Sequence, residues 1–317
     1  RRNHISAHGT LASVNHTTST SPADGWTTQT LLDWIEQHLH ENGVDEPTLV
    51  ARWLVASVIG TDPIHLFTDL NRPASIDERD ALRHLVARAA RHEPVQYLLG
   101  EAGFLGRIFE VGPGVLIPRT ATEGIVQHVL TWYRGMDPVD RPEPLYIGDI
   151  GTGSGAIAVT IACHIESAQV TAVDVSSDAV GCAEGNVRRH NLSDRIDVIQ
   201  GDLCQPLGDA GDGGRYHAIV SNPPYLSDDR WAVALPNVRE HEPAMALRGG
   251  QDGLDVIRRL LDAAPDHLHQ GGLLMIEVDD CHAEEACRLA QACALLEHAR
   301  ILRDEFGDDR FIVCSRR

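Results

Sequence analysis

The sequence contains no run of about 18 apolar residues, the length that predicts a membrane-spanning helix. Its first residues also lack the charged and then apolar pattern of a secretory signal peptide. Because neither feature points to a membrane or to secretion, we expect a cytoplasmic protein with no membrane partner.

Cysteine and histidine occur without the spacings that metal sites require. The seven cysteines include no CxxC pair, and the 17 histidines include no HExxH pattern. An odd number of cysteines without such pairs favours reduced thiols in a cytosolic-type compartment, with zinc or disulfides as the alternative. We therefore expect no metal site.

Positive charge is also scarce. The chain has 27 Lys and Arg residues against 46 Asp and Glu residues, a formal net charge of −19. Nucleic-acid phosphates repel such a protein, so the charge argues against DNA or RNA as the main substrate, unless a local basic patch exists.

The 317 residues, 43% of them hydrophobic, suffice for one large core or two modest ones. Residues 1–25 hold many Ser, Thr and His and little that could pack. We expect a disordered leader there, with the remnant of a cleaved targeting segment as the alternative.

Residues 26–94 show helical periodicity in the stretches "TTQTLLDWIEQHLHENGV", "DEPTLVARWLVASVIG" and "SIDERDALRHLVARAARH". Ser75 and Glu78 fit a capping box at the start of the third stretch. These patterns predict a small helical bundle.

Residues 95–118 are interrupted by Gly and Pro and predict a hairpin connector. From 119 to 317, apolar strand patterns alternate with helical ones, which predicts an α/β domain with a parallel sheet covered by helices on both faces. The expected strands are 145–150, 169–174, 196–200, 216–221, 272–278, 299–304 and 310–314.

The stretch "YIGDIGTGSGAIAVTIA" runs from an apolar strand through Gly151, Gly153 and Gly155 into an apolar helix. Glycines let the backbone approach a ligand closely, and the N-terminus of the following helix favours negative charge. The alternative is a tight strand-to-helix turn with no ligand.

Two acidic residues follow the next two expected strands, Asp174 in "VTAVDVS" and Asp202 in "VIQGDL". A carboxylate at the first position can accept both hydroxyls of a ribose, and one at the second can accept from an adenine amino group. Helix capping and a plain turn are the alternatives. Together with the glycines they indicate a nucleoside cofactor without saying which one.

The stretch "SNPPY" ends the fourth expected strand with Asn222, Pro223, Pro224 and Tyr225. The prolines lack N–H groups, so the turn offers carbonyl acceptors on a stiff backbone, and Asn222 adds a side-chain carbonyl. Such acceptors can hold a planar NH2 group and stabilise the charge that builds on its nitrogen as it attacks an electrophile. A rigid loop with an exposed Tyr is the alternative.

Together, "DIGTGSG", "AVDVS", "GDL" and "SNPPY" resemble the class I methyltransferases that use S-adenosylmethionine and modify a planar amino group. The stretches "EPVQYLLGEAGFLGRIFEVGPGVLIPRTATE", "REHEPAMALRGGQDGLDVIRRLL" and "EFGDDRFIV" resemble the HemK/PrmC family, the protein-(glutamine-N5) methyltransferases of peptide chain release factors. The resemblance covers roughly residues 28 to 317.

The resemblance implies a seven-stranded Rossmann-like sheet, S-adenosyl-L-methionine as cofactor, and a release factor as the partner that the helical segment 26–94 recognises. The implied cofactor residues are Gly151, Thr152, Gly153, Ser154, Gly155, Asp174, Asp202 and Leu203, with Arg119 and Glu123 in a loop beside the cofactor and Asn222 also in reach. The implied catalytic residues are Asn222, Pro223, Pro224 and Tyr225, which would hold the glutamine amide.

The chain departs from the family pattern at Thr120 and Ala121, where a Pro and an acidic residue are usual. This departure supports one alternative, a relative that binds the cofactor without turnover. Two others share most of the motifs: a ribosomal-protein glutamine methyltransferase and a nucleic-acid adenine N6-methyltransferase. The "HEP" at 241–243 also matches the family, with no role that the sequence specifies.

Overall fold

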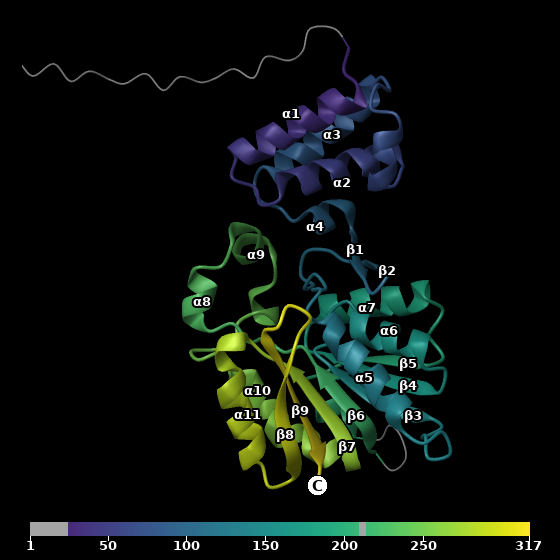
Figure 1. The fold of residues 1–317 in the computed structure, drawn as a ribbon, viewed down its shortest axis with the longest axis vertical. Coiled ribbons are helices and arrows are strands. Elements are labelled where there is room, and N and C mark those ends of the chain that lie inside the picture. The colour runs from purple at the N-terminus through teal and green to yellow at the C-terminus, as the bar shows by residue number, and fades with distance from the viewer. Residues whose placement is uncertain (1–24, 209–213) are drawn as a thin grey trace, which may run out of the picture.

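The computed structural model describes residues 25–208 and 214–317. Figure 1 shows a bundle of helices at one end of the molecule and a larger body of strands and helices at the other. Up to residue 24, the predicted disordered leader falls outside the described residues.

The bundle consists of the three predicted helices, and a 3-10 helix links the second to the third. Their bounds are α1 (Thr28–Glu41), α2 (Pro47–Ile59), η1 (Pro63–Thr68) and α3 (Ile76–Ala89). Leu31, Ile35 and Leu39 lie on one face of α1 at helical spacing, and all three are buried in the bundle core. Burial of this face holds the bundle together, since isolated helices of this length are marginal in water.

The capping box at the start of α3 is confirmed. The Ser75 hydroxyl accepts from the Glu78 N–H at 3.2 Å, and the Glu78 carboxylate accepts from the Ser75 N–H at 2.8 Å. Each side chain satisfies a backbone donor that the first helical turn leaves without a partner.

The connector holds the predicted hairpin, β1 (Glu101–Phe104) and β2 (Arg107–Glu110), preceded by a short helix that was not predicted, α4 (Val95–Leu99). The hairpin is fastened to the body by Asn186 of α7 (Ser177–Arg189). The Asn186 side chain accepts from the Glu110 N–H at 2.7 Å and donates to the Glu110 carbonyl at 2.9 Å, so it extends the hairpin edge as a backbone strand would.

The body contains one seven-stranded sheet in the order β5-β4-β3-β6-β7-β9-β8. The strands are β3 (Leu145–Ile150), β4 (Ala168–Asp174), β5 (Ile196–Gln200), β6 (Tyr216–Ser221), β7 (Leu268–Glu277), β8 (Leu296–Arg303) and β9 (Asp309–Arg316). All seven match predicted strands to within a few residues.

The predicted seven-stranded Rossmann-like sheet is confirmed, and the expected parallel pairing holds for every strand except β9. Strands β3 to β7 pair in parallel, but β9 is antiparallel to both β7 and β8. Only the residues 304–308 join β8 to β9, and so short a connection can make a hairpin but not the crossover that parallel neighbours need.

Helices cover both faces of the sheet, as Figure 1 shows. One face packs against α5 (Glu123–Gly135), α6 (Ala156–His164) and α7, and the other against α10 (Asp255–Ala263) and α11 (Ala283–Ala292). Two short helices, α8 (Asp228–Ala232) and α9 (Pro236–His241), follow β6. Within the described ranges, no helix has both the length and the apolar character to cross a bilayer.

The order of the strands reverses between β3 and β6. From β3 the chain moves outward through β4 and β5, and it then returns to place β6 on the other side of β3. The loops after β3 and β6 therefore run in opposite directions, and a crevice opens between them at the carboxyl ends of these strands. Open α/β sheets bind their ligands in such a crevice.

Candidate active site

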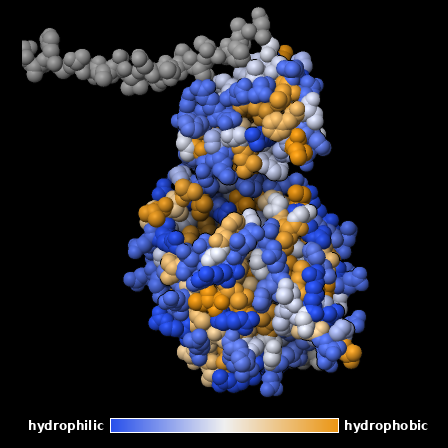
Figure 2. Space-filling model, viewed as in Figure 1, coloured by the Kyte–Doolittle hydropathy of each residue, from blue (hydrophilic) through white to orange (hydrophobic). Residues whose placement is uncertain are grey.

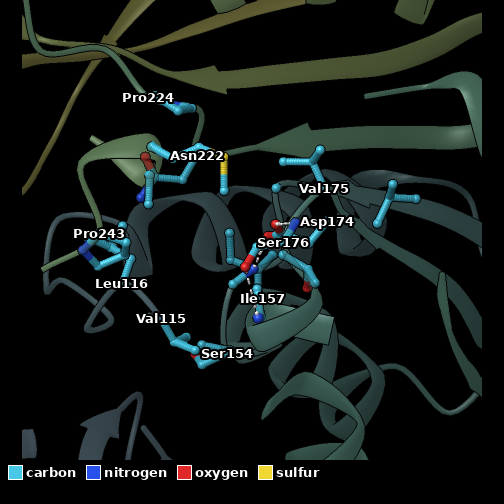
Figure 3. Close-up of a pocket in the computed structure, with 18 of the residues that line it drawn as sticks. Val115, Leu116, Ser154, Ile157, Asp174, Val175, Ser176, Asn222, Pro224 and Pro243 are labelled. Atoms are coloured by element: carbon cyan, nitrogen blue, oxygen red, sulfur yellow. Dashed lines mark hydrogen bonds between the residues drawn. The ribbon is translucent and has the colours of Figure 1, made fainter. Parts of the chain in front are cut away.

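A cavity of about 390 Å³ lies at this crevice. Its wall includes Ser154 after β3, Asp174 at the end of β4 with Val175 next to it, and Asn222 and Pro224 after β6, all labelled in Figure 3. The connector supplies Val115 and Leu116, and Pro243 follows α9. The strand-end rule therefore brings the predicted motifs to one place.

We call the wall formed by Gly151–Ser154, Asp174, Asp202 and Leu203 the glycine-loop side; Gly155, also predicted from the sequence, packs against Ala183 and is not among the residues that line the cavity. Gly151, Gly153 and Gly155 have φ values of 73°, 57° and 78°, a left-handed conformation that glycine adopts at little cost. The Gly151 and Thr152 N–H groups donate to the Val173 carbonyl at 2.8 and 3.0 Å, which ties the loop to β4. The loop is thus a fixed surface from which α6 begins.

Asp174 lies at the centre of the glycine-loop side. Its carboxylate accepts from the Gly153 N–H at 2.9 Å and from the Ser176 N–H at 3.0 Å. Burial raises the pKa of Asp174, and these backbone hydrogen bonds oppose that rise. The two donors fix the carboxylate in the wall, and its remaining lone pairs are available to hydroxyl groups in the cavity.

Asp149, which the sequence reasoning did not single out, is fully buried beneath the glycine loop. It accepts from the Thr152 hydroxyl at 2.6 Å and from the Ala158 N–H at 3.2 Å. Burial raises its pKa to about 7. This carboxylate links β3, the loop and α6, so its function is to hold the loop in shape.

Asp202 and Leu203 line the cavity on the side of β5. The Asp202 carboxylate forms an ion pair with Arg259 of α10 at 2.5 Å, and Arg259 lines the cavity too. Both side chains are about half exposed, so the pair contributes little to stability.

We call the residues 222–225 the NPPY turn. The Asn222 amide donates from Nδ2 to the Thr122 hydroxyl at 2.9 Å, which leaves its Oδ1 without a protein donor among the described residues. Thr122 lines the cavity and is buried, but nothing in the sequence singled it out. The predicted carbonyl acceptor is thus held by one specific side chain.

Tyr225 turns its hydroxyl into the protein, where it donates to Oε1 of Glu277 at 3.0 Å. Asn222 and Pro224 of the NPPY turn are among the residues that line the cavity, and Tyr225 and Pro223 are not. Burial raises the pKa of Tyr225 well above its usual value. Glu277 is the last residue of β7, a position where the strand-end rule could have found it.

The "HEP" segment joins three parts of the chain. Glu242 is buried, forms an ion pair with Arg119, and accepts from the Ile117 N–H at 3.4 Å. The His241 ring bonds the Arg91 carbonyl of the segment after α3 at 2.9 Å, and Pro243 lines the cavity. The segment therefore fastens the connector and the helical bundle beside the cavity.

Arg119 lies in the predicted loop and Glu123 begins α5, and neither is among the residues that line the cavity. Arg119 pairs with Glu242, and Glu123 accepts from the Leu105 N–H at the hairpin turn at 2.8 Å. Both side chains therefore fix the position of the connector, which supplies part of the cavity wall.

The chain is similar to known proteins over most of its length. Residues 30–100 match the family model described as the PrmC N-terminal domain, and residues 141–237 match the one described as the methyltransferase small domain. The chain is similar to the release factor glutamine methyltransferase of Geobacter sulfurreducens, with 41% identity over 82% of this chain and 86% of the relative.

Relatives of the same name in Rhodopirellula baltica and Chlorobaculum tepidum are each 36% identical, over 92% and 91% of this chain and 97% of each relative. The matches cover most of the chain, from the helical bundle to the body. The chain belongs to the family of release factor glutamine methyltransferases.

Proposed function

We propose that this protein transfers the methyl group of S-adenosylmethionine to the side-chain amide nitrogen, N5, of a glutamine in a peptide chain release factor, in its Gly-Gly-Gln motif. The observation that carries the proposal is the orientation of Asn222, whose Oδ1 is free beside the cavity because its Nδ2 is bound to Thr122. A free carbonyl oxygen there accepts from an NH2 group, and a glutamine amide carries one. Such a substrate implies work in the cytoplasm.

The glycine-loop side fits S-adenosylmethionine. A Cβ added at Gly153 would meet no atom within 4 Å, so the loop surface is open to a ligand. Asp174 presents a fixed carboxylate for the ribose hydroxyls, and Asp202 and Leu203 offer an acceptor and an apolar contact for adenine. We propose that Gly151–Gly155 hold the methionine and ribose part.

When bound, the cofactor supplies a methyl group on a sulfonium, whose sulfur keeps the bonding electron pair when the methyl leaves. Asn222 Oδ1 and the Pro223 carbonyl would accept the two amide hydrogens of the glutamine, which holds the face of its nitrogen toward the methyl. These acceptors also stabilise the positive charge that develops on the nitrogen. A methylated amide nitrogen that still carries both protons is strongly acidic, so one proton leaves to water without a protein base.

We propose that residues 26–94 recognise the release factor, that the connector 95–118 positions them, and that residues 119–317 form the catalytic domain. Three exposed apolar residues support a protein partner: Val233 and Leu235 around α8 and α9, and Met245 at the cavity. Figure 2 shows hydrophobic surface beside the recess between the bundle and the body. Such a patch is typical of a surface that binds another protein.

The direct test is methyl transfer from labelled cofactor to a release factor, with a matched release factor whose motif reads Gly-Gly-Ala as the control. Label in the first and none in the second is the expected result. If a ribosomal protein or DNA is labelled in preference to the release factor, that molecule is the substrate and the proposal is wrong. Cofactor binding without transfer to any of them would identify a non-catalytic relative.

A further inference from the structure

The segment 247–255, "LRGGQDGLD", runs beside the residues that follow the NPPY turn, and the proposed chemistry does not use it. The Leu226 N–H donates to the Leu247 carbonyl at 2.8 Å, and the Leu226 carbonyl accepts from the Gly249 N–H at 2.8 Å. The two stretches therefore pair as neighbouring parallel strands do, with Leu226 opposite Arg248. This pairing ties the end of the NPPY turn to the segment.

Gly249 is buried in this segment and leaves no room for a side chain. A Cβ added there would lie 2.7 Å from the Pro224 carbonyl oxygen and 2.6 Å from the Gly253 carbonyl oxygen. Carbon atoms in contact normally approach other heavy atoms to about 3.5–4.0 Å, so both distances are overlaps. The φ angle of Gly249 lies outside the left-handed region, so the backbone conformation does not ask for glycine. Space alone requires glycine at this position.

Gly253 lies against the next carbonyl of the NPPY turn. Its added Cβ would lie 2.4 Å from the Tyr225 carbonyl oxygen, and its φ of 77° is itself left-handed. On the glycine-loop side the turn is packed less tightly, since a Cβ at Gly151 would meet the Asn222 carbonyl oxygen at 3.7 Å, an ordinary contact. The 247–255 segment therefore limits the position of the turn more closely than the glycine loop does.

Neither partner of this contact can move alone. The Gly249 carbonyl accepts from the Asp255 N–H at 2.9 Å, so Gly249 is held between the NPPY turn and the start of α10, a helix that packs on the sheet. Pro224 lines the cavity (Figure 3), and Asn222 and Pro223, which offer the proposed acceptors, precede it in the same rigid turn. A group added at Gly249 would therefore displace the turn, and the acceptors would move with it.

We propose that Gly249 is a positioning residue for the substrate acceptors. Because it has no side chain, the Pro224 carbonyl can lie against the 247–255 segment, which keeps Asn222 Oδ1 and the Pro223 carbonyl at the depth in the cavity that methyl transfer requires. Gly253 supports the same turn at Tyr225. The inference rests on the proposed function, since it assigns a role within that substrate site.

The test measures methyl transfer to a release factor by Gly249→Ala, the smallest change that fills the space. Gly135→Ala is the matched control, because a Cβ at this exposed last residue of α5 meets no atom within 4 Å. Gly249→Ala should lose about 10²-fold in kcat, the typical cost of a misplacement of about 1 Å at the reacting groups. Its cofactor affinity by calorimetry should equal that of the wild type, and the control should match the wild type in both measurements.

A double variant separates positioning from a merely structural role. If Gly249 acts through the acceptor, Gly249→Ala should cost much less in kcat when Asn222→Ala has already removed that acceptor. A general loss of folded structure would multiply the two losses instead, so kcat is counted per folded molecule, with the folded fraction measured by urea unfolding. Losses that multiply, cofactor binding that weakens together with kcat, or wild-type turnover in Gly249→Ala would overturn the inference.

If Gly249→Ala does not fold, Gly253→Ala takes its place and should likewise lose turnover while it keeps its cofactor affinity. If neither variant folds, the glycines serve the fold rather than the turn, and the inference is wrong. Transfer by the wild type together with normal kcat in the glycine variants would overturn the role of Gly249 and leave the proposed function standing. No transfer by the wild type to the release factor would overturn both.

Discussion

The two sides of the cavity are built in different ways. On the glycine-loop side the hydrogen bonds that hold the loop join residues close in the chain: Asp149 and Thr152 are 3 positions apart, and Gly153 and Asp174 are 21 apart. The exposed pair of Asp202 and Arg259, 57 positions apart, is the exception. On the side of the NPPY turn they join distant residues: Asn222 and Thr122 are 100 positions apart, and Arg119 and Glu242 are 123 apart.

The difference separates two kinds of function. One strand-loop-helix unit and the strand beside it already form most of the glycine-loop side, so changes there should act on cofactor affinity. The acceptor at Asn222 is oriented only when the NPPY turn meets Thr122, at the start of α5, 100 positions away in the chain. Changes on that side should therefore act on turnover with little effect on cofactor binding.

The largest effect is expected at Asn222. Asn222→Ala removes a preorganised acceptor of developing charge, which typically costs about 10²–10³ in rate, or roughly 2.7–4 kcal/mol. Cofactor affinity should stay close to that of the wild type. Asn222→Asp keeps an acceptor oxygen and should be intermediate. If Asn222→Ala methylates the release factor as fast as the wild type, the NPPY turn does not control turnover and the contrast between the two sides fails.

The next largest effect is expected at Asp174, on the glycine-loop side. Asp174→Ala should weaken S-adenosylmethionine binding by about 1.5–3 kcal/mol, the usual worth of hydrogen bonds to an ionised group. Calorimetric titration measures this directly. Asp194→Ala, an exposed carboxylate outside the cavity, is the matched control and should bind normally. Equal affinities in the two variants would argue against the ribose contact.

Each side of the cavity has a buried carboxylate beneath it: Asp149 under the glycine loop and Glu277 next to Tyr225 of the NPPY turn. Burial raises the pKa of each to about 7. A raised folded-state pKa means that the folded protein holds a proton that the unfolded chain has lost. The free energy of unfolding therefore has the full contribution of these groups below about pH 4. It falls as the pH rises from about 4 to about 7, by up to about 1.4 kcal/mol per pH unit for each group.

Urea unfolding at several pH values tests that loss. Asp149→Asn and Glu277→Gln should each flatten the decline in the free energy of unfolding between about pH 4 and 7. A decline as steep in both variants as in the wild type would mean that neither carboxylate is protonated in the folded protein.

The smallest effect is expected at Glu242, which fastens the connector. Glu242→Gln weakens the ion pair with Arg119, whose side chain is about one third exposed, so we expect a loss of about 1–2 kcal/mol in the free energy of unfolding. Glu240→Gln, whose pair with Arg239 is exposed, should cost almost nothing. A loss in Glu240→Gln as large as that in Glu242→Gln would remove the special role of the buried pair.

Features that depend on neighbouring residues could be predicted from the sequence. Local patterns predicted the capping box of Ser75 and Glu78 and all seven strands. They also predicted the loop at Gly151, Gly153 and Gly155, because glycine adopts a left-handed backbone at little cost. The gathering of Asp174, Asp202 and Asn222 at one crevice followed because parallel strands end at the same edge. Their roles toward ligands stay predictions.

Tertiary structure alone decided which single residues complete the site. Thr122 lies 100 positions from Asn222 and carries no local signal, and Tyr225 turns inward only because a buried acceptor lies 52 positions away. The sequence singled out the segment of Glu242 but not its pairing with Arg119, 123 positions away. The physical reason is that a buried polar group must find a hydrogen-bond partner, while the chain that surrounds it decides which partner is near.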